Sequence, residues 1–121
     1  MTNYIKFFAL IFTAGLIIFS CKKDKKKDED PKQADCSSMS VKYTSYVSKI
    51  LETRCTQTSC HAAGSSNGDY TTYNGVKAVV SSGAFERRVF DENPTVMPPG
   101  GALPKATLDS LWCWLEKGAP K

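Results

Sequence analysis

The residues best suited to chemistry lie in the stretch CTQTSCH, residues 55–61. It contains two thiols, Cys55 and Cys60, followed directly by His61, the only histidine of the chain. Two such thiols can hold a haem through thioether bonds, with the adjacent imidazole as an iron ligand. The usual attachment signature has two residues between the cysteines, whereas this stretch has four, residues 56–59. The type and order of the three residues therefore fit haem attachment, and their spacing departs from the usual one.

Two other interpretations of the same stretch stay open from the residues alone. Cys55 and Cys60 could form a disulfide that closes a small loop, with His61 on the surface. A zinc site would need a fourth ligand besides these three residues, and Cys36 or Cys113 would have to supply it. An oxidising compartment, where disulfides persist, disfavours a thiolate site of that kind.

A second ligand for a haem iron would have to be a methionine, because the chain has no second histidine. Beyond the leader, the candidates are Met39 and Met97. Met97 lies in VMPPGG, where Pro98 and Pro99 restrict the backbone, and a stiff loop can hold a weak thioether ligand with little loss of entropy. A His/Met pair raises the reduction potential of a haem, which is typical of electron transfer. We therefore predict a metal-binding protein with His61 and Met97 as iron ligands.

The start of the chain has the pattern of a secretory leader. Residues 1–6 are short and basic, and residues 7–19 form an apolar run that is shorter than the about 20 residues needed to span a bilayer. The run suits the apolar region of a signal peptide, and its end at Cys21 resembles a bacterial lipobox. We expect residues 1–20 to be a lipoprotein signal peptide and Cys21 to carry lipid. The remainder would then be membrane-anchored on the periplasmic, outer-membrane or cell-surface side.

The charged segment after Cys21 separates this leader from the folded part. Residues 22–35 hold six lysines and five acidic residues, without aromatic or large aliphatic side chains, so they cannot bury enough apolar surface to fold. We assign residues 21–39 to the lipidated cysteine and a disordered tether, and residues 40–121 to one domain. From Cys36 onward, nine Lys and Arg face seven Asp and Glu, a net charge of +2. That charge is too small to indicate nucleic-acid binding.

The folded part reads as all-α. Apolar residues recur at helical spacing over residues 41–53, with Ser40 as a candidate cap. Further helices are expected over residues 73–80, 84–90 and 107–117, the last ended by Gly118. Glycine and proline place long loops at residues 64–69 and 93–101. Long loops in a small domain suggest that a cofactor fills its centre. The side chains that would line such a pocket, or else form ordinary core, are Phe85, Leu103, Trp112 and Trp114; Arg87 and Arg88 could pair with haem propionates.

Four features together resemble a known family. They are the helix YTSYVSKILETR leading into CTQTSCH, the glycine-rich loop, MPPGG some 36 residues after His61, and the closing LPKATLDSLWCWLEKGAP. Over residues 41–120 the chain resembles the single-haem c-type cytochromes, and more closely the cytochrome c-like domains of small Bacteroidetes and Planctomycetes lipoproteins. The resemblance implies a small all-α domain packed around one covalent haem c. Cys55 and Cys60 would carry the thioethers, with His61 and Met97 as axial ligands.

The resemblance also implies redox-protein partners and a disulfide. The first and last helices cross in the cytochrome c fold, which would bring Cys36 and Cys113 within reach of a disulfide. The expected function is electron transfer between redox proteins, without catalysis. Two rivals remain: a haem-free, disulfide-stapled surface lipoprotein that acts as a binding module, and a haem enzyme or sensor with an open sixth position.

Overall fold

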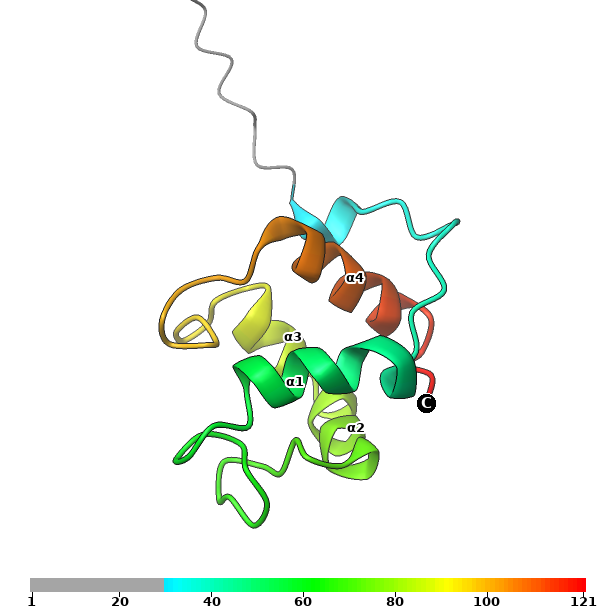
Figure 1. The fold of residues 1–121 in the computed structure, drawn as a ribbon. Coiled ribbons are helices and arrows are strands. Elements are labelled where there is room, and N and C mark those ends of the chain that lie inside the picture. The colour runs from blue at the N-terminus through cyan, green and yellow to red at the C-terminus, as the bar shows by residue number, and fades with distance from the viewer. Residues whose placement is uncertain (1–29) are drawn as a thin grey trace, which may run out of the picture.

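The computed structural model describes residues 30–121. The predicted signal peptide 1–20, the lipidation site Cys21 and the tether up to residue 29 lie outside the described residues. Residues 30–121 form helices joined by turns and loops and contain no strand, in agreement with the all-α prediction. The elements in chain order are η1 (Pro31–Gln33), η2 (Tyr43–Val47), α1 (Ser48–Arg54), α2 (Tyr73–Ser81), α3 (Ala84–Val89) and α4 (Lys105–Glu116). Figure 1 shows α1 crossing the bundle, with a wide loop between α3 and α4 at one side.

The first predicted helix is a π-turn, η2, that continues directly into α1. Ser40 does not cap it, because the N-cap position falls at Lys42, whose side chain makes no capping bond. The backbone N–H of Tyr43 instead donates to the Pro120 carbonyl, at 3.0 Å. A bond from the far end of the chain thus satisfies one of the N–H groups that every helix start leaves unpaired.

Helices α2 and α3 pack against each other and agree closely with the sequence prediction. Thr72 caps α2 by accepting a hydrogen bond from Gly75 N–H at 3.1 Å. Gly83, with φ of 72°, makes the left-handed turn between the two helices, a conformation that glycine adopts without a Cβ penalty. The tight turn fixes the inner face of α3 against α2.

Helix α4 contributes the largest part of the core. Leu111 and Trp114 are almost fully buried, together with Val47, Leu51 and Phe85 from the other helices. Trp112 and Leu115 are only half-buried, whereas Leu108, Leu111 and Trp114 of the same helix are buried. The Trp114 indole N–H donates to the Pro120 carbonyl at 2.9 Å, so the polar edge of this buried ring is satisfied.

The C-terminal residues Gly118 to Pro120 join three elements through their carbonyl oxygens. Lys77 Nζ donates to Gly118 at 2.6 Å, and the Tyr73 hydroxyl donates to Ala119 at 2.9 Å. Pro120 accepts from both Tyr43 and Trp114, as described above. The end of the chain therefore fixes α2 and η2 against α4.

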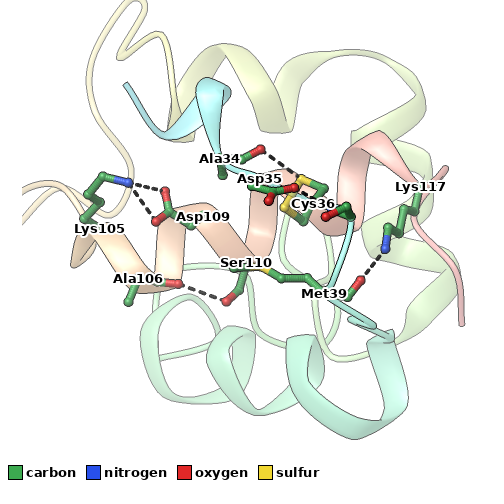
Figure 2. Close-up of a disulfide and its surroundings, with 11 residues drawn as sticks. Ala34, Asp35, Cys36, Met39, Lys105, Ala106, Asp109, Ser110 and Lys117 are labelled. Atoms are coloured by element: carbon green, nitrogen blue, oxygen red, sulfur yellow. Dashed lines mark hydrogen bonds and ion pairs between the residues drawn. A yellow bond between two sulfur atoms is a disulfide. The ribbon is translucent and has the colours of Figure 1, made fainter. Parts of the chain in front are cut away.

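The segment of residues 30–39, which the sequence analysis assigned to the tether, lies beside α4, and η1 contacts that helix (Figure 1). A disulfide joins Cys36 to Cys113 in α4, with Cα atoms 5.1 Å apart (Figure 2). Lys117 Nζ also contacts the Met39 carbonyl. The attachment begins before the expected start at Ser40, because contacts from distant residues hold a segment whose own composition would leave it solvated.

Lys32 adds a second attachment for the same segment. Its ammonium lies 2.7 Å from Glu86 Oε1 and 2.5 Å from Asp91 Oδ1, and 5.4 Å from the centre of the Trp112 ring. Hydrogen bonds to Asp91 and then Glu86 raise the pKa of Lys32 above its usual value. These groups tie the N-terminal segment to the end of α3.

A membrane-spanning helix is not found among residues 30–121, where every helix is too short or too polar for that role.

Candidate functional site

A cavity of about 580 Å³ lies between α1, α3 and the two long loops. Its volume is within the range of about 300–1,000 Å³ that is typical of small-molecule and cofactor sites. All four predicted haem-binding residues line it: Cys55, Cys60, His61 and Met97. Apolar side chains make up much of the remaining wall, among them Leu51, Val79, Phe85, Val89, Leu103 and Leu111. The fold therefore brings together two thiols, an imidazole and a thioether at one largely apolar cavity.

The CTQTSCH stretch is a compact loop that starts at the end of α1. The N–H groups of Cys55 and Thr56 both donate to the Leu51 carbonyl, at 2.8 and 3.0 Å. The His61 N–H then donates back to the Cys55 carbonyl at 3.0 Å, and Ser59 adopts a left-handed φ of 72°. The four intervening residues are mostly exposed, and two of them, Gln57 and Ser59, lie at the edge of the cavity. This closure absorbs the wide spacing and keeps both cysteines and the histidine on the cavity.

The His61 ring is held by two contacts. Its Nδ1 lies 3.2 Å from the Gly68 carbonyl, a contact that fits an Nδ1–H donor and leaves Nε2 free to act as a ligand. One face of the ring stacks on Tyr70, with centroids 3.9 Å apart and planes 12° from parallel. The glycine-rich loop between His61 and Tyr70 is thus the element that brings both partners back to the imidazole.

The two thiols of the cavity are unpaired, since the disulfide uses Cys36 and Cys113. Cys55 and Cys60 are both half-buried. Burial raises the pKa of the Cys55 thiol to about 11, and the neighbouring Cys60 adds to the shift. Burial likewise raises the pKa of Tyr70 to about 12, with a smaller contribution from Cys55. Cys55 is therefore a protonated thiol at neutral pH, in an apolar setting that does not activate it.

Met97 reaches the cavity from the loop between α3 and α4. Its backbone N–H donates to the Arg88 carbonyl at 2.9 Å, and its half-buried side chain packs against the core. The bond anchors the centre of the loop to the last turn of α3. Met39, the other methionine of the described residues, is not among the residues that line the cavity.

The two neighbouring arginines have different positions. Arg88 is half-buried and lines the cavity, as does Arg54 from the end of α1. Arg87 is exposed, and its Nη1 donates to the Ser82 carbonyl at 3.3 Å. Among residues 30–121, no acidic side chain lines the cavity. Its charged groups are therefore cationic, and of the pair named from the sequence, Arg88 is the one that can meet an anionic group there.

The apolar side chains predicted to line a pocket are also separated by the fold. Phe85 and Leu103 line the cavity. Trp114 is fully buried in the core behind it, and its ring meets that of Phe85 edge to face at 6.4 Å. Trp112 faces Phe90 and Lys32 instead. Ordinary packing thus accounts for the two tryptophans.

The prediction of a metal-binding protein is wrong. Within residues 30–121, no group of three or more His, Cys, Asp or Glu side chains is arranged to hold a metal ion. The described side chains therefore do not form a metal site by themselves. The zinc interpretation fails for the same reason, and because Cys36 and Cys113, which would have supplied the fourth ligand, are bonded to each other.

Two residues of the site were not identified from the sequence. The sequence predicts Gly68 only as part of a loop, and it predicts no role for Tyr70. Both contact His61, at seven and nine residues along the chain. An aromatic residue at the end of a glycine-rich loop that follows the histidine was the available signal, but the loop conformation that brings it back cannot be read from periodicity.

Comparison with known proteins returned no match: no protein-family model, curated protein or solved structure is significantly similar to the chain.

Proposed function

We propose that the chain is a lipid-anchored electron-transfer protein that carries one covalent haem c in the cavity described above. The proposal rests on one observation: a single cavity is lined by Cys55, Cys60 and His61 and also by Met97, which is distant from them in the sequence. These are the two thioether thiols and the two axial ligands that the resemblance to cytochrome c-like domains assigns. A bound haem would supply a one-electron couple at its iron.

The residues of the cavity fit a haem in three respects. Both thiols are unpaired, as thioether formation requires. The His61 Nδ1 is occupied by the Gly68 carbonyl, which leaves Nε2 as the ligand atom. The wall is largely apolar, with Arg54 and Arg88 available for the two carboxylates of the ring. Because the porphyrin nitrogens hold most of the coordination sphere, the chain needs to provide axial ligands only, and not a group of several metal-binding side chains.

Each side chain has a defined task in this proposal. Cys55 and Cys60 would carry the haem through thioether bonds, and His61 and Met97 would ligate its iron. The apolar wall excludes water, which together with a thioether ligand raises the reduction potential. The chain itself makes and breaks no bond in a substrate, and its partners are redox proteins that exchange one electron at a time. Anchoring through Cys21 would keep it at the membrane outside the cytoplasm.

Intact mass after denaturation tests the covalent haem. Expression with a haem-maturation system should add the mass of one haem to the chain. Replacing both Cys55 and Cys60 by alanine should abolish the addition, whereas replacing Cys36 and Cys113 should leave it in place, because those two cysteines are outside the cavity. An unmodified wild-type mass would refute the haem proposal and favour the haem-free binding module.

Met97→Ala tests the sixth ligand. The variant should keep the covalent haem but lose the absorption band that depends on a Met–iron bond, and it should gain affinity for small exogenous ligands. Met39→Ala is the matched control and should leave both properties unchanged. A Met97→Ala spectrum identical to that of the wild type would instead favour the enzyme or sensor with an open sixth position.

A further inference from the structure

We propose that Tyr70 is a positioning residue that fixes the plane of the His61 ring, and through it tunes the reduction potential of the site. The inference rests on the proposed haem function, because it assigns a role to Tyr70 only through His61 as a ligand. It starts from the contact between the two rings, whose centroids lie 3.9 Å apart and whose planes differ by 12°.

The phenol ring is itself rigidly placed. Tyr70 is only 8% exposed and belongs to the main core cluster. Its ring contacts Phe85 at 6.2 Å between centroids, and Phe85 in turn contacts Trp114 at 6.4 Å. The backbone N–H of Tyr70 donates to the His61 carbonyl at 2.9 Å. A ring held on one side by the core and along its backbone by the histidine cannot turn away from the imidazole.

The hydrogen bond and the stack act on different motions of His61. The contact of Nδ1 with the Gly68 carbonyl, at 3.2 Å, selects the tautomer and points Nε2 away from it. A single hydrogen bond still allows the ring to rock about its long axis. Face-to-face contact with Tyr70 opposes that rocking, because tilting either ring would force their faces together on one side. The two contacts together define both the direction of Nε2 and the plane of the ring.

The contact between the Tyr70 ring face and the imidazole also has an electronic consequence. The face of a phenol ring carries partial negative charge, which stabilises positive charge placed against it. An imidazole bound to ferric iron is more electron-poor than one bound to ferrous iron, so the Tyr70 face favours the oxidised state. Removing the ring should shift the oxidised-to-reduced ratio at a fixed ambient potential by about two- to fivefold toward reduction. For a one-electron couple this equals an increase of about 20–40 mV, at 59 mV per tenfold.

Three variants of the haem-loaded full chain separate positioning from packing. Tyr70→Leu should raise the potential and change the anisotropy of the low-spin ferric EPR signal, which reports the ligand plane. Tyr70→Phe keeps the stacked ring and should restore both readouts to wild type. Phe90→Leu removes a half-buried aromatic ring that packs against the same core but lies outside the cavity and faces Trp112, and it should leave the EPR signal and the potential unchanged. An unchanged Tyr70→Leu protein, or an equal shift in Phe90→Leu, would overturn the assignment.

A measurement on the wild type tests the contact itself without any substitution. NMR of the reduced protein should show cross-relaxation between the ring protons of Tyr70 and His61, and an upfield ring-current shift of the His61 protons beyond that caused by a haem. Absence of the cross-relaxation overturns the proposal even if Tyr70→Leu does not fold. An unmodified intact mass would refute the haem, whereas missing cross-relaxation would refute the contact between Tyr70 and His61. The failure of the haem proposal and the failure of the Tyr70 proposal are therefore distinguishable.

Discussion

The disulfide between Cys36 and Cys113 should provide a large share of the stability of this small domain. It closes a loop with a sequence separation of 77 residues. The chain-entropy relation gives about 4.5 kcal/mol for a loop of that size at 25 °C. A domain of about 90 residues is typically stable by about 5–14 kcal/mol in total. Replacing both cysteines by alanine should therefore remove a third or more of the free energy of unfolding.

Urea denaturation of the double variant and the wild type, in the same state of haem loading, measures this loss. With a slope of about 1.5 kcal/mol/M, the midpoint should fall by about 3 M. The slope should also rise, because the unfolded chain without the cross-link exposes more surface. Alanine is the suitable replacement, since Cys113 is fully buried and a serine hydroxyl there would add the cost of an unpaired polar group.

Reduction of the wild-type disulfide with a thiol-free reductant provides the control. It should lower the midpoint as much as the double substitution does, because both release the same loop. A loss below about 1 kcal/mol in both experiments would refute the loop-entropy reasoning. Peptide mapping under non-reducing conditions that found Cys36 and Cys113 as free thiols would refute the cross-link itself.

Two further predictions concern the packing of α2 and the thiol of the cavity. Gly75→Ala should destabilise the fold by about 3 kcal/mol or more in a thermal melt, since a Cβ there would lie 1.9 Å from the Asp69 carbonyl oxygen. Gly100→Ala is the control, because a Cβ there would meet nothing within 4 Å, and it should stay within about 0.5 kcal/mol of wild type. Equal effects of the two substitutions would contradict the packing around Gly75. In haem-free protein, alkylation of Cys55 should continue to accelerate up to about pH 11, because burial raises its pKa from 9.0 to about 11. The folded state then holds this proton at a pH where the unfolded chain has lost it, so stability should decline above about pH 9. A Cys55 alkylation rate that levels off at pH 9, measured by mass spectrometry, would contradict this assignment.

Helix positions were largely predictable because they follow from local patterns. The apolar spacing of residues 73–80 and 84–90 and the breaks around Gly83 are set by neighbouring residues, and α2 and α3 agree with them within one or two residues. The start of the first helix was not predictable in the same way. Its Tyr43 N–H is satisfied by Pro120, and a bond across most of the chain leaves no trace in the local sequence.

The same reason explains the N-terminal segment. Lys32 lies in a run of charged residues whose composition predicts a solvated chain. Its partners Glu86 and Asp91 are more than fifty residues away. Cys113, the disulfide partner of Cys36 in the same segment, is 77 residues from Cys36. Composition describes what a segment can bury by itself, and it does not describe what distant residues can hold in place.

By itself the sequence determined the chemical inventory of the site: one histidine, directly after Cys60, and two methionines beyond the leader. The peptide bond between Cys60 and His61 keeps these two residues together in any fold. Only the tertiary structure decided that Met97 shares their cavity, that Arg88 lines it while Arg87 does not, and that Tyr70 stacks on His61. These contacts depend on how α3 and the two long loops pack around α1, and packing between distant segments is not encoded in the spacing of neighbouring residues.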